Sequence, residues 1–542
     1  MNRRYPGGLL LAGIAALLTV SLITVSAFAG LALHAGGLPL LVVLGNPYTW
    51  SIVRFTILQA TLSTVISVFL AIPLARALHR RQGFFGRRLL LRLTSISLVV
   101  PTMVAILGMV AVHGRGGWVN DLLVMLGLSR KDYLYGLTGI LLAHVFFNLP
   151  LATRLVLQAL SDIPAAQWRL AVLYGFDRTA IFRLVEWPAI RPSLAGAAGI
   201  VFLLCFTSFA IVLSLGGGPG ANTLEVAIYQ ALRFDFDLPR AVALSIIQIV
   251  FCCAIAWLVF ARHGGPTLSA GDIGTDHAAQ RPDHGDRLAR ALDITVIMVA
   301  ALYLLTPFAA VLVNTLDGPG WLIVIHGRFW QALGWSLFIA LAAGVLATVF
   351  GFSIAWLRAS LLQSSRWSFA TVGVDLCATL TLVLPPLTLG AGLFLLARQF
   401  TGALSLGHWM VIAVNALFAL AFALRILAAP VAIQRGRFDL LCQGLGIRGY
   451  SRWKLIDWPL LKRPLGYALA ITTTLSAGDM GVIALFGTDQ LTTLPLLIYR
   501  LLGAYRLDQA AVVAVCLCLL CLLLFWSLEQ VARLGRDGHQ HA

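Results

Sequence analysis

Twelve runs of apolar residues, separated by polar segments, set the fold class of this 542-residue chain. A helix needs about 20 apolar residues to cross a bilayer, and within lipid the backbone must satisfy its own hydrogen bonds. With 59% hydrophobic and 11% charged residues, the chain does not resemble a soluble enzyme or a disulfide-stapled secreted protein. We therefore predict an all-α integral membrane protein with about 12 transmembrane helices. The runs cover 9–33, 53–75, 94–113, 137–159, 195–215, 240–261, 292–314, 332–357, 371–396, 409–431, 466–486 and 509–531.

The positions of the basic residues predict how these helices are oriented. The chain carries 39 Lys and Arg against 22 Asp and Glu, and most of the basic residues fall in one set of alternate connections. Cytoplasmic loops of membrane proteins hold such an excess of Lys and Arg. The first run, 9–33, is longer than the ~7–15-residue apolar core of a signal peptide, so we expect it to be retained. Both termini are then predicted to be cytoplasmic.

The cysteines and the histidines of the central polar segment do not form a metal motif. Cys516, Cys518 and Cys521 have only apolar neighbours, which is typical of small helix residues and offers no polar groups around a metal. His277 and His284 lie in segment 263–290, whose Gly, Asp, His and Pro content is typical of a solvated linker. We expect no metal and no cofactor bound by this chain.

The chain is also a tandem duplication. Motif residues recur at nearly constant offsets of 270, 271 and 284 positions, which shared apolar composition does not explain. Each repeat has an even number of spans, so the halves run parallel and are related by a pseudo-twofold axis along the membrane normal. The recurring pairs include Gly175 and Gly446, Trp187 and Trp458, Pro188 and Pro459, Gly216 and Gly487, Pro101 and Pro385, and Gly108 and Gly392.

The duplication divides the chain into segments. We predict two parallel halves of six helices each, with a cytoplasmic linker between them, and in each half the first span and its outer loop precede the repeat proper. The boundaries are 1–53 for the N-terminal span and outer loop, 54–262 for repeat 1, 263–290 for the linker, 291–331 for the seventh span and outer loop, 332–531 for repeat 2 and 532–542 for a cytoplasmic tail.

The cytoplasmic loop after the fourth span of each repeat contains an amphipathic segment. In the first repeat it runs from Pro164 to Gly175, a helix start and a helix stop. In the second it runs from Phe438 to Gly446, with apolar residues at helical spacing. A surface helix of ~10 residues is marginal alone, so its apolar face needs the bilayer surface or another protein as a partner.

A second motif follows each of these segments. It reads Phe182-Arg-Leu-Val-Glu-Trp187-Pro188 in the first repeat and Trp453-Lys-Leu-Ile-Asp-Trp458-Pro459 in the second, with a further proline before the chain re-enters the membrane. Helix, glycine, aromatic residue and paired prolines together resemble the coupling loop of ABC-importer permeases, in which the helix docks on a cytoplasmic ATPase. The resemblance assigns this coupling role to Arg169, Ala171, Gly175, Phe182, Pro188, Asp439, Leu441, Gly446, Trp453 and Pro459.

One departure from that family concerns the start of the coupling motif. The family pattern usually begins with Glu-Ala-Ala, whereas this chain has Arg169-Leu170 and Leu440-Leu441 at the first two positions. Asp439 is the acidic residue nearest to the second site. Whether an acid contributes to holding the ATPase is therefore open.

The outer part of the fifth span narrows the resemblance. The segments Phe206–Pro219 and Thr223–Leu232 closely resemble the fused permeases of bacterial thiamine importers, which have the type I ABC importer fold. The resemblance implies a permease in the bacterial inner membrane with a small cationic substrate, thiamine, and by extension its phosphates. It also implies a periplasmic substrate-binding protein and a separate ATPase dimer that carries ATP and Mg. The fused permeases of ferric-iron importers share this layout and are the alternative.

Two other classes fit less well. A secondary transporter of the major facilitator type also has twelve spans in parallel halves, but it does not predict paired amphipathic helices in matched loops. A chain with its own ATPase would need a Gly-x4-Gly-Lys-Ser/Thr loop, and none of the three lysines follows a glycine. We therefore predict a transport subunit with no catalytic residue. The basic net charge is assigned to loop orientation rather than to nucleic acid.

Asp479 falls about two-thirds of the way through the eleventh predicted span, counted from the cytoplasm. An ionised Asp there costs at least ~2.5–3.5 kcal/mol on insertion scales, so it should face protein or a water-filled path. One hypothesis places Asp479 and its repeat counterpart Ser208 on the substrate pathway, with Gly478 and Gly481 allowing close approach. The other pairs Asp479 with an Arg or Asn of a neighbouring helix.

Acids in the outer loops suggest a docking surface. We expect a binding protein to be guided to such charges, although solvated loop acids are the simpler reading. The residues concerned are Glu225, Asp235, Asp237, Asp489 and Asp508.

Overall fold

The computed structural model describes residues 7–33, 40–81, 83–84, 86–87, 90–91, 100–263, 287–316, 318–362, 371, 373–374, 384–397 and 406–533. Within these residues all regular structure is helical. Eleven helices are long and apolar enough to cross a membrane, each overlapping a predicted run. The remaining run, 371–396, lies partly outside the described residues, and its end forms α17. The predicted all-α membrane fold is confirmed.

The elements of the two halves follow the same order in their membrane-spanning helices, while some of the short elements between these differ. In the first half they are α1 (Gly7–Leu33), α2 (Leu40–Gly45), α3 (Pro47–Arg80), α5 (Thr102–His113), α6 (Trp118–Met125), α7 (Leu137–Ser161), α8 (Ala165–Leu173), α9 (Arg178–Ile181), the π-helical turn η1 (Phe182–Glu186), α10 (Trp187–Phe206), α11 (Ala210–Leu215), the 3-10 turn η2 (Pro219–Ala221), α12 (Leu224–Arg233) and α13 (Leu238–His263). In the second half they are α14 (Arg287–Leu316), the 3-10 turn η5 (Pro319–Ile325), α15 (Gly327–Leu362), α17 (Pro386–Ala397), α18 (Gly407–Gly444), α19 (Gly449–Arg452), the π-helical turn η6 (Trp453–Asp457), α20 (Trp458–Gly478), α21 (Gly481–Phe486), α22 (Leu494–Gly503) and α23 (Leu507–Arg533).

The duplication extends to single hydrogen bonds. The backbone N–H of Leu224 donates to Thr56 Oγ1 over 3.1 Å, and that of Leu494 donates to Ser336 Oγ over 2.8 Å. Each bond anchors the first residue of a short outer helix, α12 or α22, to the second span of its own repeat. Thr56 and Ser336 are 280 positions apart. The two halves therefore share side-chain contacts as well as helix order.

Two predicted spans are interrupted. The fifth breaks between α10 and α11 at Thr207–Phe209, and the eleventh breaks between α20 and α21 at Asp479 and Met480. We expected continuous helices at 195–215 and 466–486, and that expectation is wrong. Each break leaves backbone groups of a membrane-embedded segment without helical partners, which is tolerated only where the segment lies against protein or a cavity.

The two halves exchange their first helices. α1 packs on α15 and α17 of the second half, while α14 packs on α3 and α5 of the first half. Glycines make both crossings close, because a Cβ on Gly392 would lie 2.0 Å from the carbonyl oxygen of Ala27 and a Cβ on Gly108 would lie 2.6 Å from that of Pro307. Each half is therefore completed by a helix of the other.

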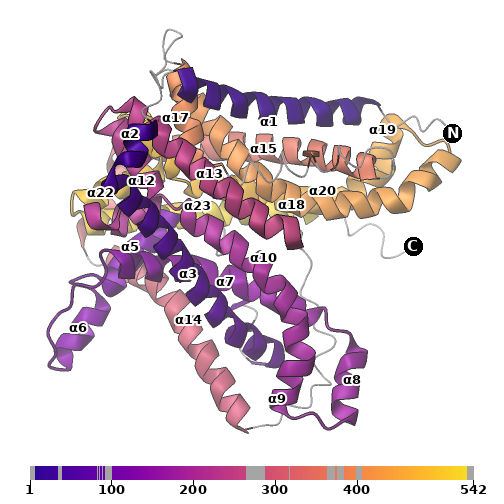
Figure 1. The fold of residues 1–542 in the computed structure, drawn as a ribbon, viewed down its shortest axis with the longest axis horizontal. Helices are drawn as coiled ribbons and strands as arrows, with labels where there is room; N and C mark the ends of the chain where they lie inside the picture. Colours follow the sequence, from indigo (N-terminus) through magenta and orange to yellow (C-terminus); the bar gives the residue numbers. More distant parts are fainter. Residues whose placement is uncertain are drawn as a thin grey trace.

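The helices form two arms that diverge from a common junction (Figure 1). One arm contains α3, α7, α10 and α14 and ends at α8 and α9, and the other contains α1, α15, α18 and α20 and ends at α19. At the junction the halves cross again, since α12 packs on α17 and α21 while α22 packs on α5. The loop segments with the coupling motifs thus lie at the far ends of separate arms.

Candidate functional site

The first coupling segment forms a separate short helix, as predicted. α7 ends at Ser161, Pro164 occupies the cap position with extended backbone, and α8 begins at Ala165. Trp168 anchors α8 to the membrane-spanning helices, because its buried ring stacks on His79 of α3 with centroids 5.9 Å apart. Ala171 is also buried, whereas Arg169 is exposed. The predicted coupling residues of α8 are therefore divided between an inner and an outer face.

Both coupling segments end at a glycine in the left-handed region, as predicted. Gly175 has φ 61° and Gly446 has φ 67°. After each glycine the next N–H reaches back five residues, from Phe176 to the carbonyl of Ala171 over 2.9 Å and from Ile447 to that of Cys442 over 2.9 Å. This is the hydrogen-bond pattern of a Schellman motif, which fixes the direction in which the chain leaves the helix.

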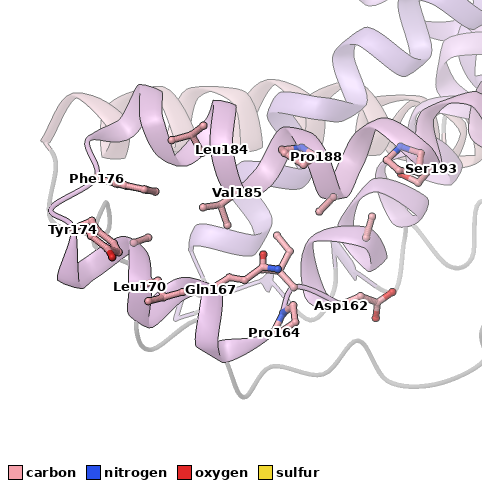
Figure 2. A pocket seen from close by; sticks show the side chains of 15 residues that line it. Asp162, Pro164, Gln167, Leu170, Tyr174, Phe176, Leu184, Val185, Pro188 and Ser193 are labelled. Atoms are coloured by element: carbon pink, nitrogen blue, oxygen red, sulfur yellow. The ribbon is translucent and has the colours of Figure 1, made fainter.

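An open groove of about 710 Å³ separates α8 from the start of α10 (Figure 2). Leu170 and Gln167 line one wall, and Val185 and Pro188 line the other. Arg76 holds the second wall in place, since its guanidinium pairs with Glu186 at 2.6 Å and lies 4.4 Å from the centre of the Phe182 ring. Phe182 therefore supports the loop, while Pro188 is exposed at the groove.

The second coupling segment is not a separate helix, contrary to our expectation. Residues 438–444 are the last turns of α18, which runs unbroken from Gly407 to Gly444. The reason lies at the position 271 residues after Pro164, where Arg435 stands in place of the proline and allows the helix to continue. Leu441 is exposed on this helix end, and Pro459 is exposed beyond it.

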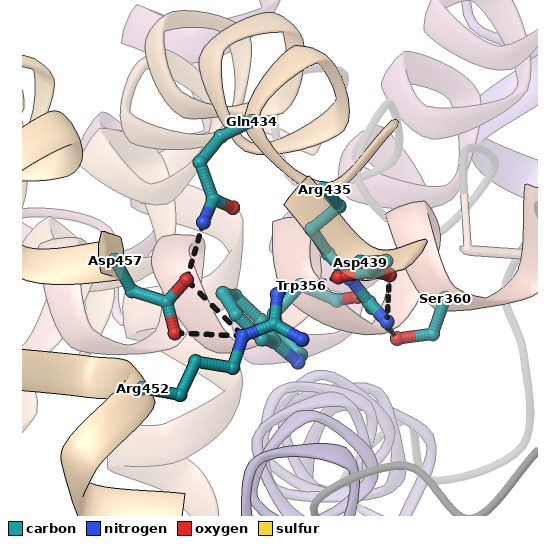
Figure 3. A network of polar contacts seen from close by, with 7 residues as sticks. All are labelled: Trp356, Ser360, Gln434, Arg435, Asp439, Arg452 and Asp457. Carbon is teal, nitrogen blue, oxygen red and sulfur yellow. Dashed lines mark hydrogen bonds and ion pairs between the residues drawn. The ribbon is translucent and has the colours of Figure 1, made fainter. Parts of the chain in front are cut away.

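Asp439 is buried in an ion network (Figure 3) and does not face outward. Its Oδ2 accepts hydrogen bonds from Nε and Nη2 of Arg435 over 3.2 and 3.1 Å, and its Oδ1 accepts one from Arg452. Arg452 also pairs with Asp457 of η6 at 3.2 Å. Asp439 therefore holds α18 to the following turn, and a direct role in place of the missing Glu does not fit this geometry.

Trp356 of α15 completes the network. Its ring lies beneath both guanidinium groups, 4.8 Å from the Cζ of Arg435 and 5.6 Å from that of Arg452. The ring of Phe352, one turn earlier, meets Trp453 edge to face at 5.7 Å. The predicted coupling residue Trp453 is therefore partly buried against α15, and the second coupling segment is fastened to a span at several points.

A second site lies where the two halves meet. A cavity of about 230 Å³ is lined by residues of α5, α7, α10, α11 and α12 from the first half and of α17, α18, α20 and α21 from the second. Ser208 and Asp479, the predicted pathway residues, both line it, one at each helix break. Gly478 allows the halves to approach, because a Cβ there would lie 3.0 Å from the Cα of Pro101. The structure thus brings Ser208 and Asp479 to one cavity.

The carboxylate of Asp479 is only half satisfied. Its Oδ1 accepts from the backbone N–H of Gly481, the first residue of α21, over 3.3 Å. Its Oδ2 is buried and has no hydrogen-bond partner in the part of the chain that the structure describes. The alternative of a bond to an Arg or Asn of a neighbouring helix is not found among those residues.

Glu225 is a second carboxylate at this cavity, and our expectation of an exposed docking acid is wrong. It is 1% exposed on α12, between two spans, and accepts a hydrogen bond from Gln248 of α13. The pKa of Glu225 is raised to about 7, chiefly by burial and to a smaller extent by the Asp479 carboxylate, against the lowering effect of hydrogen bonds from Gln248 and the backbone of Leu387. The sequence did carry a signal for this burial. On a helix, Glu225 shares one face with Ile228, Tyr229 and Leu232, which are all buried.

The other outer acids remain at the surface or near it. Asp235 pairs with Arg240 at 3.5 Å, and Asp489 pairs with Arg500 at 3.3 Å. These local pairs are what solvated loop acids would form. The binding-protein surface proposed from the sequence stays a prediction for them.

Comparison with known proteins identifies the family to which the chain belongs. Residues 64–261 match the family model described as binding-protein-dependent transport system inner membrane component. The thiamine transport system permease protein ThiP of Salmonella typhimurium LT2 is 43% identical over 98% of each chain, and that of Escherichia coli K12 is 42% identical over 98% of each. ThiP of Brucella abortus 2308 is 41% identical over 98% of this chain and 96% of its own. With such identity over nearly its full length, this chain belongs to the family of thiamine transport system permease proteins.

Proposed function

We propose that the chain forms the translocation pathway of an ABC importer for thiamine. The observation that carries this proposal is the cavity between the halves, where Asp479 presents a carboxylate oxygen with no partner among the described residues. Thiamine has a fixed positive charge on an aromatic ring, and a buried acid in a pathway stabilises such a group. The names of the full-length relatives support the same substrate.

The ferric-iron alternative lacks support from the chain. A bound iron would need several oxygen, nitrogen or sulfur ligands converging on one point. No group of three or more His, Cys, Asp or Glu residues within the described ranges could hold a metal ion. The full-length relatives at 41–43% identity also carry the thiamine name.

The proposed energy source is a separate cytoplasmic ATPase dimer, with ATP and Mg bound in that partner. The exposed face of α8, the groove beside it and the exposed end of α18 supply two contact sites, one at the end of each arm. A periplasmic binding protein would deliver the substrate at the junction. We also propose that both termini are cytoplasmic, because the start of α1 and the end of α23 lie near the coupling end of the second arm. Gly13 packs on Leu357 and Gly466 packs on Ala532 there.

Reconstitution tests the proposal. The permease, its ATPase and its binding protein are placed in lipid vesicles, and uptake of labelled thiamine is measured together with ATP hydrolysis. Wild type should import thiamine only with ATP and both partners. Asp479→Asn, which removes the charge and keeps the shape, should hydrolyse ATP but lose most transport, while Asp121→Asn, at a surface acid outside the cavity, should transport nearly normally. Native transport by Asp479→Asn would contradict the pathway role, and no import by the complete wild-type assembly would contradict the function.

A further inference from the structure

Two carboxylates, one from each half, reach the cavity at the junction. Asp479 lies at the break in the second half, and Glu225 comes from α12 of the first half. The repeat counterparts of these residues, 271 and 270 positions away, are Ser208 and Pro495. Each half therefore contributes one acid at a position where the other half has none, so neither acid is needed to form the repeat fold.

The cavity supplies no cation to balance these acids. None of the described residues that line it is a lysine or an arginine. The groups that contact the two carboxylates are neutral donors, namely the Gln248 side chain and backbone N–H groups of Gly481 and Leu387. Two nearby carboxylates with only neutral donors repel one another, and a positive charge placed between them would relieve this repulsion.

A third polar group at the cavity is also incompletely bonded. His144 is 2% exposed, its Nδ1 lies 3.0 Å from Ser63 Oγ, and its Nε2 has no hydrogen-bond partner among the residues described. Together with the unpartnered Oδ2 of Asp479, this leaves two polar atoms at one cavity for which the described part of the chain supplies no hydrogen-bond partner. Buried polar atoms are normally bonded, so both point to a ligand.

The other residues that line the cavity favour an organic cation over a metal ion. Phenylalanines of both halves line the same cavity as the two acids, and aromatic faces attract organic cations. A metal ion would instead need several converging ligands, which are lacking within the described ranges. At about 230 Å³ the cavity is smaller than the roughly 300–1,000 Å³ of typical ligand pockets, which suits the transit of one charged ring more than storage of a whole ligand. The aromatic residues are Phe147, Phe209, Phe418 and Phe422.

We infer that Glu225 and Asp479 form a two-carboxylate transit site that selects an aromatic organic cation between the halves. This inference rests on the proposed function and names a residue, Glu225, that acts on the same substrate. Because α12 packs on α17 and α21, Glu225 reaches the cavity across the interface between halves. The site therefore exists only in arrangements of the arms that keep this crossing, and separating the halves would release the cation.

The test compares a cationic with a neutral substrate. Vesicles containing the permease, ATPase and binding protein are given thiamine or its analogue in which an uncharged thiophene replaces the thiazolium ring. The ratio of the two uptake rates is measured for wild type, Glu225→Gln and Glu225→Asp. The binding protein is the same throughout, so its own preference cancels between variants. Glu225→Gln should lower the ratio about tenfold, equivalent to roughly 1.4 kcal/mol, and Glu225→Asp should keep it close to wild type.

Asp121→Asn is the matched control, because Asp121 is a surface acid of the first half outside the cavity. It should leave the ratio unchanged. An unchanged ratio in Glu225→Gln, with native ATP hydrolysis, would overturn the inference while leaving the thiamine function intact. If Glu225→Gln does not assemble, Glu225→Asp decides: assembly with a low ratio would overturn the inference, and assembly with the native ratio would support it. Failure of wild type to import thiamine would refute the proposed function instead.

Discussion

Replacing Asp439 distinguishes a residue that contacts the ATPase from one that holds the permease together. The structure places Asp439 inside the permease with a side chain that is 7% exposed, between Arg435 and Arg452. Asp439→Ala would remove the carboxylate that lies between Arg435 and Arg452 over the same tryptophan ring, while Arg452 would keep its ion pair with Asp457. Removing one member of a buried ion pair costs about 3–5 kcal/mol, because the remaining charge loses a partner inside the protein.

Thermal unfolding of the purified permease measures this cost. For a unit of about 200 residues, 1 kcal/mol shifts the midpoint by roughly 2–4 °C, so Asp439→Ala should lower it by about 10 °C. The double variant Arg435→Met with Asp439→Leu should recover most of the loss, since replacing a buried pair by apolar residues is often neutral. Arg437→Ala, on the exposed side of the same helix, is the control and should change little.

The opposite pattern would refute this reasoning. If Asp439→Ala unfolds at the wild-type temperature but no longer binds the ATPase, Asp439 acts at the interface and not within the permease. Loss of ATPase binding without recovery in the double variant would lead to the same conclusion. A fall in midpoint that the double variant reverses would confirm the internal role.

Three further predictions concern the coupling segments and the cavity. Gly175→Ala should destabilise the loop by about 1–2 kcal/mol and lower transport per ATP hydrolysed, because its φ is positive while its surroundings leave space for a Cβ; Gly436→Ala, an open helical site, should instead be neutral or slightly stabilising in the same thermal and transport assays. Cysteines at Arg169 and Leu440 should cross-link to an ATPase subunit with a yield that changes on adding ATP, and absence of both products on gels would contradict docking at the arm ends. Since burial raises the pKa of Glu225 to about 7, this carboxylate is neutral below that pH and charged above it, so the preference for thiamine over the uncharged analogue should rise between about pH 6 and pH 8 in wild type and stay flat in Glu225→Gln.

Local sequence signals predicted the spans, the repeat and the ends of the coupling segments. Apolar runs predict helices in lipid because a single segment can satisfy all of its own backbone hydrogen bonds there only as a helix. The left-handed turns at Gly175 and Gly446 could be predicted because glycine adopts a positive φ without strain. These features depend on residues that are close together in the chain, so they can be predicted from the sequence alone.

The features that were missed depend on contacts between distant residues. Hydropathy reports how apolar a segment is, and it does not show that the helix around Asp479 is broken against the other half. The motif match at 438–446 does not reveal that Arg435 permits a continuous helix and then buries Asp439. In the sequence Glu225 falls in an outer loop, and only the packing of α12 on the other half shows that it is buried. In each case contacts between residues far apart in the sequence decided the environment of the side chain.

The exchange of α1 and α14 also bears on how such a chain arises. A homodimer in which each subunit lends its first helix to its partner already has two composite arms. Joining the end of one copy to the start of the next leaves every one of those packing contacts unchanged, because the order of helices within each copy is preserved. The same exchange makes the fused halves mutually dependent. Fragments covering residues 1–263 and 287–542 would each lack one helix of their own arm, so they are expected to persist only when produced together.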